Sequence, residues 1–379
     1  MHKYLIFIFT ITFFWANEKI FVVCEGNYYS NNGSLWAISE ENVYEYLDNP
    51  IGNVAQSLYI QENKLYVLIN GSSNIQVFDI HEDDLIPTQY IVTNGSGPRE
   101  MLIHENFLYF TNWNTADVKI INLTTWTIET TIITPGLPED IILHNGLLYV
   151  SIIMNHDWTD GSQIITIDPN INEIIDSFEV GLGPGSLLVH EGEIYVSRTY
   201  YDDNWNAYYG TSKIKQNGEV VIVEYGSGNA CGGGIYSFQN SVYRIYDGGI
   251  AMLDDELNIM PETRLGNYNS WEVYSAEVFG EYIYFGLSDF MDPDEVAVVN
   301  TDGEEVASYS VGVLPGDFAV WNNCIADGDT NYDAVINVLD IIIIANIITS
   351  YGYDCQADMN ADNQLNILDI IILAELILD

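Results

Sequence analysis

A short pattern of oxygen-bearing residues occurs twice near the end of the chain, at residues 329–340 and 358–369. Both copies place Asp or Asn at loop positions 1, 3, 5, 9 and 12, and an apolar residue at position 8. Proteins enclose a hard cation such as calcium with oxygen ligands at alternating positions of a tight loop, closed by a carboxylate at position 12. The pattern therefore predicts two calcium ions. The oxygen side chains are those of Asp329, Asn331, Asp333, Asn337 and Asp340, and of Asp358, Asn360, Asp362, Asn366 and Asp369.

An aliphatic helix is predicted directly after each loop, over residues 341–348 and 370–378. The first turn of each helix is apolar on every side, which is more than one buried helix face requires. We expect this surface to be covered. Either the two helices pack on each other and a partner covers the rest, or they dock on the remainder of the chain.

The two loop-helix units resemble a type I dockerin, the calcium-dependent module that binds cohesin domains, over about residues 324–379. The resemblance implies a cohesin-like or other surface protein as partner. It also implies the carbonyl groups of Val335 and Gln364 as ligands, and it makes Asn337 and Asn366 ligands directly or through water.

Position 6 distinguishes the two loops. The dockerin family prefers Gly there, and this chain has Ala334 in the first loop and Asn363 in the second. Asn tolerates a left-handed backbone, whereas Ala is strained in it by about 1 kcal/mol. The first site is therefore expected to bind calcium more weakly than the second.

The four cysteines allow three pairings if all of them are bridged. Cys324 and Cys355 bracket the first loop-helix unit, and an exported protein can form a disulfide there. We expect that bridge. Cys24 and Cys231 lie far apart in the repeats described next and are expected to be buried free thiols.

From residue 17 to about residue 322 the chain repeats with a period of about 40–48 residues, a length typical of propellers and solenoids. The repeat marker is a strand with an aromatic residue between apolar neighbours. It occurs seven times, at residues 19–22, 64–67, 107–110, 147–150, 193–196, 241–244 and 282–285. A turn and a strand precede most copies, and two further strands follow. Four short antiparallel strands with Gly, Pro and Asn turns make one propeller blade.

The ends of the array predict how the ring closes. The first copy has no turn and strand before it, whereas the last such pair, at residues 315–320, has no aromatic strand after it. We expect residues 315–321 to pair beside residues 19–24 and to complete the first blade. This pairing would remove an open sheet edge.

The Leu-Tyr-Val strands and Gly-Pro turns resemble the seven-bladed surface propellers of the YVTN type over residues 17–322. The resemblance implies an all-β, seven-bladed β-propeller, followed by the small α-helical, calcium-binding dockerin-like domain at residues 323–379. A fold of this kind leaves the activity open.

The loops between the second and third strands of the blades are expected to share one face with the loops that lead into the inner strands. Their aromatic residues, beside carboxylates and amides, suit stacking on sugar rings, and they would also suit a protein partner. Alternatively, long loops carry such residues to pack against themselves. The candidate ligand-binding residues are Tyr28, Tyr29, Trp113, His156, Trp158, Tyr200, Tyr201, Trp205 and Tyr208.

Catalysis would need a nucleophile or an acid–base pair in the central channel. Candidates that start the inner strands are Glu100, Glu139, Asp140, Glu272 and Asp317. No spacing singles out a pair, because glycosidase carboxylates cannot be paired from sequence. We therefore expect a non-catalytic binding or display protein attached by its tail. The alternatives are a carbohydrate-active enzyme, a glycoside hydrolase or lyase, in a polysaccharide-degrading assembly, and a tail that only caps its own chain.

The charge of the chain excludes some partners. With 55 acidic and 10 basic residues among 379, the formal net charge is −45. Such a charge repels nucleic acid and anionic lipid and attracts divalent cations. No nucleic-acid partner is expected.

Residues 1–16 are expected to form a secretory signal peptide, with an apolar run at residues 4–15 and Ala16 as the cleavage point. The run is too short to span a bilayer, and no later segment is long enough without charges. The expected location is secreted, extracellular or on the cell surface, without membrane insertion. An uncleaved N-terminal anchor is the alternative.

Overall fold

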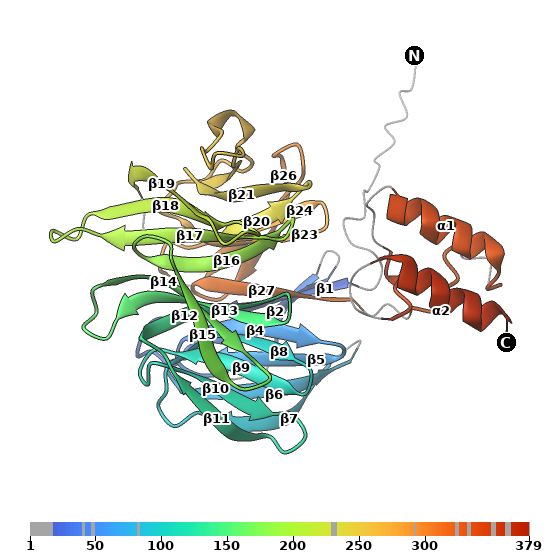
Figure 1. Cartoon of the computed structure of the whole chain (residues 1–379), viewed down its shortest axis with the longest axis horizontal. Coiled ribbons are helices and arrows are strands. Elements are labelled where there is room, and N and C mark those ends of the chain that lie inside the picture. Colours follow the sequence, from blue (N-terminus) through green and yellow to red (C-terminus); the bar gives the residue numbers. More distant parts are fainter. Residues whose placement is uncertain are drawn as a thin grey trace, which may run out of the picture. The chain divides into compact units, whose positions relative to one another are not determined.

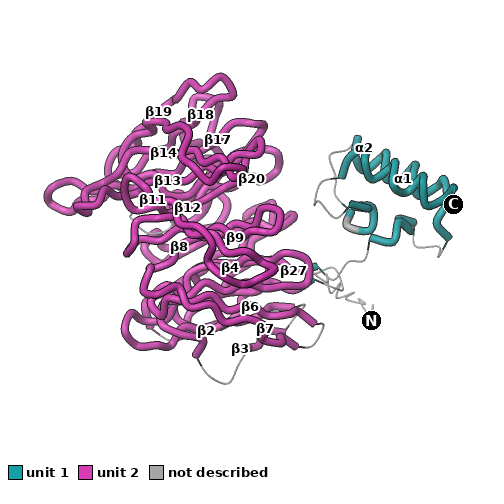
Figure 2. Tube along the Cα trace, turned by 60° about the horizontal axis from the view of Figure 1, so that its bottom comes forward, with its two compact units in different colours: residues 1–18, 322–379 teal, residues 19–321 magenta. Residues whose placement is uncertain are grey.

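The computed structural model describes residues 18–39, 42–46, 50–81, 84–228, 233–291, 293–322, 326–331, 335–349, 354–360 and 365–378. The chain divides into two compact units (Figure 2). One unit is Lys19–Trp321, and the other comprises Met1–Glu18 and Asn322–Asp379. The expected signal peptide lies outside the described residues, as do Cys231, Cys324 and the side chain of Cys355. The expected disulfide therefore stays a prediction.

The larger unit is a seven-bladed, all-β propeller of antiparallel sheets (Figure 1). From the inner strand outward, blades 1 to 3 are β27 (Pro315–Asn322), β1 (Glu18–Cys24), β2 (Ser34–Ser39) and β3 (Asn42–Tyr46); β4 (Ala55–Gln61), β5 (Lys64–Ile69), β6 (Asn74–Ile80) and β7 (Leu85–Val92); and β8 (Pro98–His104), β9 (Phe107–Asn112), β10 (Asp117–Asn122) and β11 (Thr127–Ile133).

Blades 4 to 7 follow in chain order. They are β12 (Gly136–His144), β13 (Leu147–Asn155), β14 (Asp160–Asp168) and β15 (Glu173–Glu179); β16 (Pro184–His190), β17 (Glu193–Tyr201), β18 (Ala207–Ile214) and β19 (Val220–Ser227); β20 (Ile235–Phe238), β21 (Ser241–Tyr246) and β22 (Gly249–Met252); and β23 (Val273–Phe279), β24 (Tyr282–Leu287), β25 (Asp294–Val299) and β26 (Glu305–Val311). The inner strands of neighbouring blades contact one another from β4 round to β23.

Each sheet buries both faces because it is packed between two neighbours. One apolar cluster joins Phe21 and Leu35 of blade 1 to Leu65 and Val67 of blade 2. Equivalent clusters fill the spaces between neighbouring blades from blade 2 round to blade 7. The sequence of the second strand of a blade is therefore almost continuously apolar, as in β5, because both of its faces are buried.

The predicted closure is confirmed. Strand β27 pairs with β1, so the C-terminal strand of the propeller completes the blade that the N-terminal strand begins. The indole N–H of Trp321 donates to Asn63 Oδ1 at 3.0 Å, which ties the closing strand to blade 2. Cys24, the last residue of β1, is a buried free thiol as expected.

Blade 6 differs from the predicted four strands. Its sheet has three, and single bridges join Ile250 to Leu265 and Leu253 to Ile259 in place of the fourth. A short 3-10 helix, Pro261–Thr263, interrupts this segment. Pro261 has no N–H to give to a sheet, so a regular outer strand cannot run through it.

The smaller unit contains two α-helices, α1 (Val338–Thr349) and α2 (Ile367–Leu378), and a 3-10 turn at Cys355–Ala357. Both helices begin three residues earlier than predicted, because Asn337 and Asn366 act as N-caps. Their Oδ1 atoms accept the N–H groups of Leu339 and Leu368, each at 2.9 Å. None of the described helices is long and apolar enough to cross a membrane.

Candidate functional site

Both loops of the tail close on a buried carboxylate at position 12. Asp340 and Asp369 are completely buried. Asp340 accepts the N–H of Asn331 at 3.2 Å and that of Asn337 at 2.8 Å. Asp369 accepts from Asn360 at 3.4 Å and from Asn366 at 2.8 Å. The two loops thus use the same contacts, from positions 3 and 9 to position 12.

The donor set of the tail fits a hard cation. Asp358, at position 1 of the second loop, is also buried. Residues 323–379 include ten acidic residues and no Lys, Arg or His, so the unit has no basic side chain of its own to offset these charges. Fully buried carboxylates are rare in proteins unless a cation pairs with them.

Three of the expected ligands, Asp333, Asp362 and Gln364, lie outside the described residues. In the part of the tail that is described, the N–H of Asp329 donates to Asp327 Oδ1 at 3.0 Å, and the Val335 carbonyl accepts from Asn337 Nδ2 at 2.9 Å. Within the described ranges, no three His, Cys, Asp or Glu side chains come together as a metal site.

On the propeller, three of the candidate aromatic residues meet in one cavity. Trp113 follows β9, and His156 and Trp158 lie in the turn between β13 and β14, so the cavity lies between blades 3 and 4. It has a volume of about 340 Å³, and Leu137 and Ile133 also line it. The two indole rings meet edge to face, with centroids 6.3 Å apart.

Four hairpin tips of this face hold an aromatic residue in the left-handed region. The φ angles are 66° for Tyr29, 67° for Trp158, 63° for Trp205 and 66° for Phe290. These side chains are exposed by 83%, 61%, 83% and 48%. Left-handed geometry costs a residue with a Cβ roughly 1–2 kcal/mol. Sixteen other non-glycine residues among those described also have positive φ, so the backbone of these four tips is ordinary for a turn. What distinguishes the four tips is that each exposes an aromatic ring that could contact a ligand.

Short polar contacts hold these tips in place. The N–H of Trp158 donates to Asn155 O at 3.0 Å, that of Trp205 to Asp202 O at 2.9 Å, and that of Phe290 to Ser288 Oγ at 2.9 Å. The N–H of Tyr29 donates to Asn53 Oδ1 of blade 2 at 3.1 Å.

The remaining aromatic candidates divide into two groups. Tyr28 is exposed and lies beside Tyr29. In the hairpin of β17 and β18, Tyr201 packs near the exposed Trp205, whereas Tyr200 stacks on Tyr208 and its hydroxyl bonds Glu224. Tyr200 and Tyr208 thus pack within their own hairpin, which was the alternative expectation for these loops.

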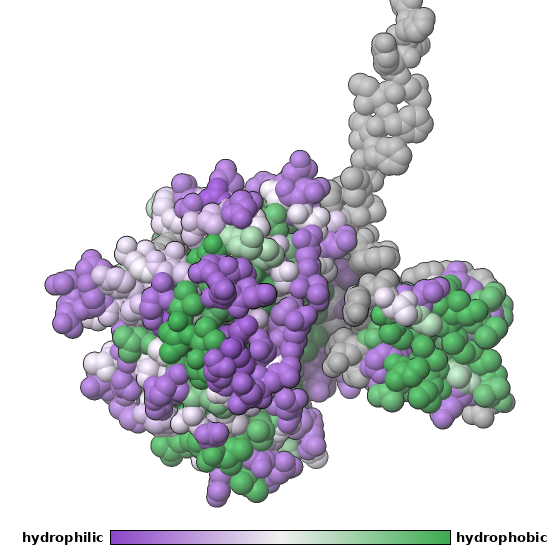
Figure 3. Space-filling model, turned by 45° about the horizontal axis from the view of Figure 1, so that its top comes forward, coloured by the Kyte–Doolittle hydropathy of each residue, from purple (hydrophilic) through white to green (hydrophobic). Residues whose placement is uncertain are grey.

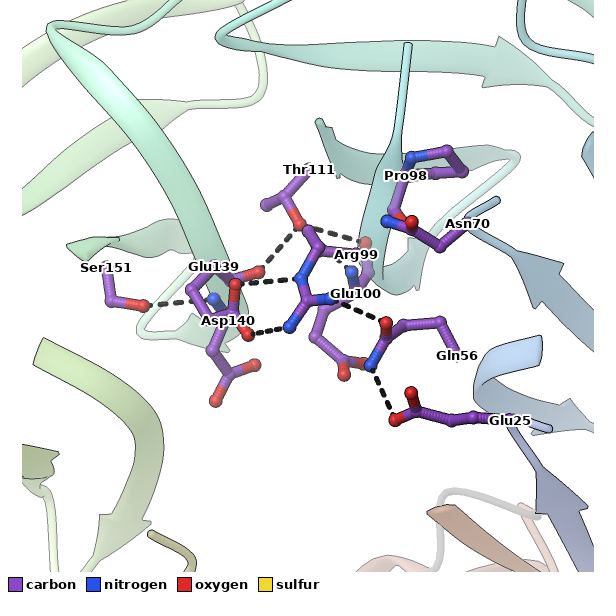
Figure 4. A network of polar contacts seen from close by, with 10 residues as sticks. All are labelled: Glu25, Gln56, Asn70, Pro98, Arg99, Glu100, Thr111, Glu139, Asp140 and Ser151. Carbon is purple, nitrogen blue, oxygen red and sulfur yellow. Dashed lines mark hydrogen bonds and ion pairs between the residues drawn. The ribbon is translucent and has the colours of Figure 1, made fainter. Parts of the chain in front are cut away.

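An arginine that the sequence did not single out connects the aromatic cavity to the central channel. Arg99 forms a two-armed ion pair with Glu139, at 3.0 Å from Nε and 2.6 Å from Nη2. Its third arm bonds Gln56, which in turn donates to Glu25 at 3.5 Å (Figure 4). The guanidinium also stacks on Trp113, 4.2 Å from the ring centroid. Side chains from four blades thereby fix one wall of the cavity.

The channel beyond Arg99 is lined by carboxylates from several inner strands. Three of the predicted candidates, Glu100, Asp140 and Asp317, lie near enough to act on one another, and Glu277 of β23 joins them. Most inner strands have a register shift at their start, as between Pro98 and Met101. Such a bulge redirects the side chains that follow it. Glu272 lies apart from this group and accepts from Asn269 Nδ2 at 2.8 Å.

Burial raises the pKa of every member of this group. It raises the pKa of Asp140 to about 6, although N–H groups of Leu187 and Ile141 stabilise the ionised form. The pKa of Asp317 rises to about 7 and that of Glu277 to about 8, again mainly because of burial. The pKa of Glu100 lies well above its ordinary value, because of burial and then the charges of Asp317 and Asp140.

Replacing Arg99 by Lys is expected to lower the free energy of unfolding by about 2 kcal/mol, because an ammonium group cannot bond both Glu139 oxygens and Gln56 while stacking on Trp113. Chemical denaturation followed by tryptophan fluorescence measures the change. Arg264→Lys is the matched control, since Arg264 pairs with the exposed Asp247 and such pairs contribute less than 1 kcal/mol. Equal losses in the two variants would contradict the role given to Arg99.

No protein-family model matches this sequence, and no curated protein is significantly similar to it. Solved structures with the same fold are numerous. A putative 6-phosphogluconolactonase from Bacteroides fragilis superposes with a TM-score of 0.56 at 13% identity, over 81% of this chain and 98% of that one. A hypothetical selenium-binding protein from Sulfolobus tokodaii gives 0.59 at 8% identity, over 81% and 94%. A functionally unknown protein from Desulfotomaculum acetoxidans gives 0.59 at 12%, over 81% and 99%. Identities this low establish the propeller fold alone.

Proposed function

We propose that this protein is a secreted or cell-surface binding protein whose propeller face binds an uncharged glycan. The observation that carries the proposal is the set of four exposed, left-handed aromatic tips, with the cavity between Trp113 and Trp158 beside one of them. Flat rings beside amides and carboxylates suit the apolar faces and hydroxyl groups of sugars. The net charge of −45 disfavours anionic polymers.

Affinity electrophoresis of the full chain in gels that contain neutral polysaccharides tests this function. Trp158→Ala and Trp205→Ala are expected to weaken retardation about tenfold each, because a lost ring contact contributes about 1.5 kcal/mol. Tyr90→Ala is the control, since Tyr90 is equally exposed but lies on the outer strand β7. Unchanged migration of the unmodified protein in every polysaccharide would overturn the proposal.

The tail is proposed to attach the protein, once loaded with two calcium ions, to a cohesin-like or other surface partner. The buried carboxylates Asp340, Asp358 and Asp369 support the metal. Exposed apolar residues that recur 29 positions apart support a partner, and Figure 3 shows the apolar surface of the two helices. The repeated exposed residues are Val338 and Ile367, Leu339 and Leu368, and Ile342 and Ile371.

Size-exclusion chromatography with a purified type I cohesin module tests the attachment. A complex is expected in calcium and not in chelator, and Leu339→Ser with Leu368→Ser is expected to abolish it while calcium binding persists. A tail that stays monomeric with every cohesin would favour a cap on its own chain.

A carbohydrate-active hydrolase or lyase is the second candidate. The channel carboxylates favour it, because Asp140, Asp317 and Glu277 have pKa values from about 6 to about 8, the range that suits proton transfer near neutral pH. A screen for reducing sugars or unsaturated products separates the two functions, since a binding protein is retarded by its polysaccharide and releases nothing.

A further inference from the structure

A second cavity adjoins the aromatic one at the seam between blades 3 and 4. It has a volume of about 570 Å³ and lies along β14 and β15. Ile133, the last residue of β11, lines both cavities. The two cavities are therefore adjacent at the junction of blades 3 and 4, and we call them together the seam groove.

The two ends of the seam groove differ in chemistry. The inner end is aromatic, whereas Ile165, Ile174 and Ile175 make the outer end aliphatic. Ile133, Ile174 and Ile175 lie on outer strands and are exposed to water, although their side chains are apolar. A ligand that fits both ends needs sugar-like faces for the rings and small apolar substituents for the isoleucines.

Polar groups at the rim of the seam groove limit which ligands it could bind. Asn114 and Thr115 lie at the inner end, and Gln163 and Ser177 at the outer end. They can pair with amide and hydroxyl groups. No Lys or Arg is among the residues that line either cavity, and Asp176 is among those that do. The nearest basic groups, Lys119 beside Thr115 and Arg99 against Trp113, are already paired with Asp117 and Glu139, so they offer an anionic chain little attraction.

We propose that the seam groove binds a linear, uncharged, N-acetylated glycan of the chitin type, a proposal that rests on the glycan-binding function above. One sugar ring stacks on the exposed indole of Trp158, beside Trp113. The chain continues past Ile133, and the acetamido methyl groups of the next sugars pack on Ile133 and Ile175. Their N–H and carbonyl groups face the amides and hydroxyls at the rim.

Calorimetric titration of the full chain with chitohexaose and cellohexaose tests this, since the two differ in the acetamido groups. Chitohexaose is expected to bind about tenfold more tightly, because each buried methyl group contributes several-fold in affinity. Chitobiose is expected to bind more weakly than the hexamer, because it cannot reach the outer end. Trp158→Ala is expected to weaken binding of both hexamers about tenfold, because the ring contact is lost.

The double variant Ile133→Ser with Ile175→Ser is expected to remove most of the preference for chitohexaose and to keep the weaker binding of cellohexaose. Ile133 and Ile175 are 66% and 49% exposed, so the fold tolerates these changes. The matched control is Ile86→Ser with Ile222→Ser, at 47% and 45% exposure on blades 2 and 5.

The outcomes separate the two proposals. Equal affinity for the two hexamers, or a preference that the isoleucine variant retains, overturns the N-acetylated ligand and leaves glycan binding standing. Binding of deacetylated chitosan alone, lost at high salt, also overturns it, because the attraction is then one of charge. No binding of any glycan, with capture of apolar peptides at the groove, overturns both.

Discussion

Calcium chelation is expected to unfold the C-terminal tail and to leave the propeller folded. Among the described residues of the tail, the fully buried apolar core consists of Ile344, Ala357 and Leu373. A core this small cannot hold a unit in which Asp340, Asp358 and Asp369 are buried without basic residues nearby in sequence. Ligation would supply the missing stability, because a site that forms only in the folded chain turns binding free energy into folding free energy.

Far-UV circular dichroism of the full chain measures this transition, because α1 and α2 are the two α-helices of the described chain. We expect the 222 nm signal to fall in chelator and to return with calcium, while the near-UV signal of the propeller stays unchanged. An unchanged far-UV spectrum would count against calcium-dependent folding.

Two single variants compare the sites. Asp369→Ala is expected to cost more calcium affinity and more helix than Asp340→Ala, because alanine at position 6 of the first loop tolerates a left-handed backbone less well than asparagine at position 6 of the second. Equal losses of calcium affinity in the two variants would mean that the residue at position 6 does not make the second site stronger than the first.

The propeller is expected to become less stable as the pH rises from 5 to 9. Asp140, Asp317 and Glu277 have folded-state pKa values of about 6, 7 and 8. In an unfolded chain they titrate near pH 4. Between these values the folded state holds more protons than the unfolded state, so its stability falls with pH, by roughly 1.4 kcal/mol per pH unit for each extra proton. The loss ends above pH 8, where all three are ionised in both states.

Thermal unfolding at constant ionic strength, followed by tryptophan fluorescence, measures the slope. The variant Glu100→Gln with Glu277→Gln removes two of the buried titrating carboxyl groups while keeping side-chain shape, so it should raise the melting temperature at pH 8 and flatten the slope. Glu129→Gln, an exposed change on β11, should alter neither. A wild-type stability that rises between pH 6 and 9 would refute the assignment.

The propeller could be predicted from the sequence because each blade is built from short strands and turns that are adjacent in sequence. An aromatic strand such as β13 (Leu147–Asn155) is followed by a turn in every blade, so the pattern can be recognised without knowing which blades pack together. The closing strand could be predicted because the first repeat lacks an inner strand, whereas the inner strand at residues 315–320 has no repeat after it. Blade 6 departs from the pattern because Pro261 and the turn before it replace a strand, a change that the period alone does not reveal.

The hydrogen-bond network around Arg99 was harder to predict. It joins residues 31 to 43 positions apart in sequence, which come together only when neighbouring blades pack into the ring. One sequence feature could have found it. Gln56, Arg99 and Glu139 occupy the same place in three successive repeats, two residues before a buried apolar residue of the bulged inner strand, which is Leu58, Met101 or Ile141. The left-handed backbone at Trp158 and Trp205 could not be predicted from the sequence, because tryptophan disfavours positive φ and only the closed hairpin imposes it.

The closing strand also determines how the propeller would respond to force. A pull on the tail enters the propeller at Asn322, the last residue of β27. The part of that force that acts along β27 is borne in shear by the hydrogen bonds between β27 and β1. Asp317 and Trp321 add side-chain bonds from the same strand to Leu58 and Asn63 of blade 2. The strand that seals the ring is thus also its mechanical anchor, and we expect the tail to give way under tension before the propeller does.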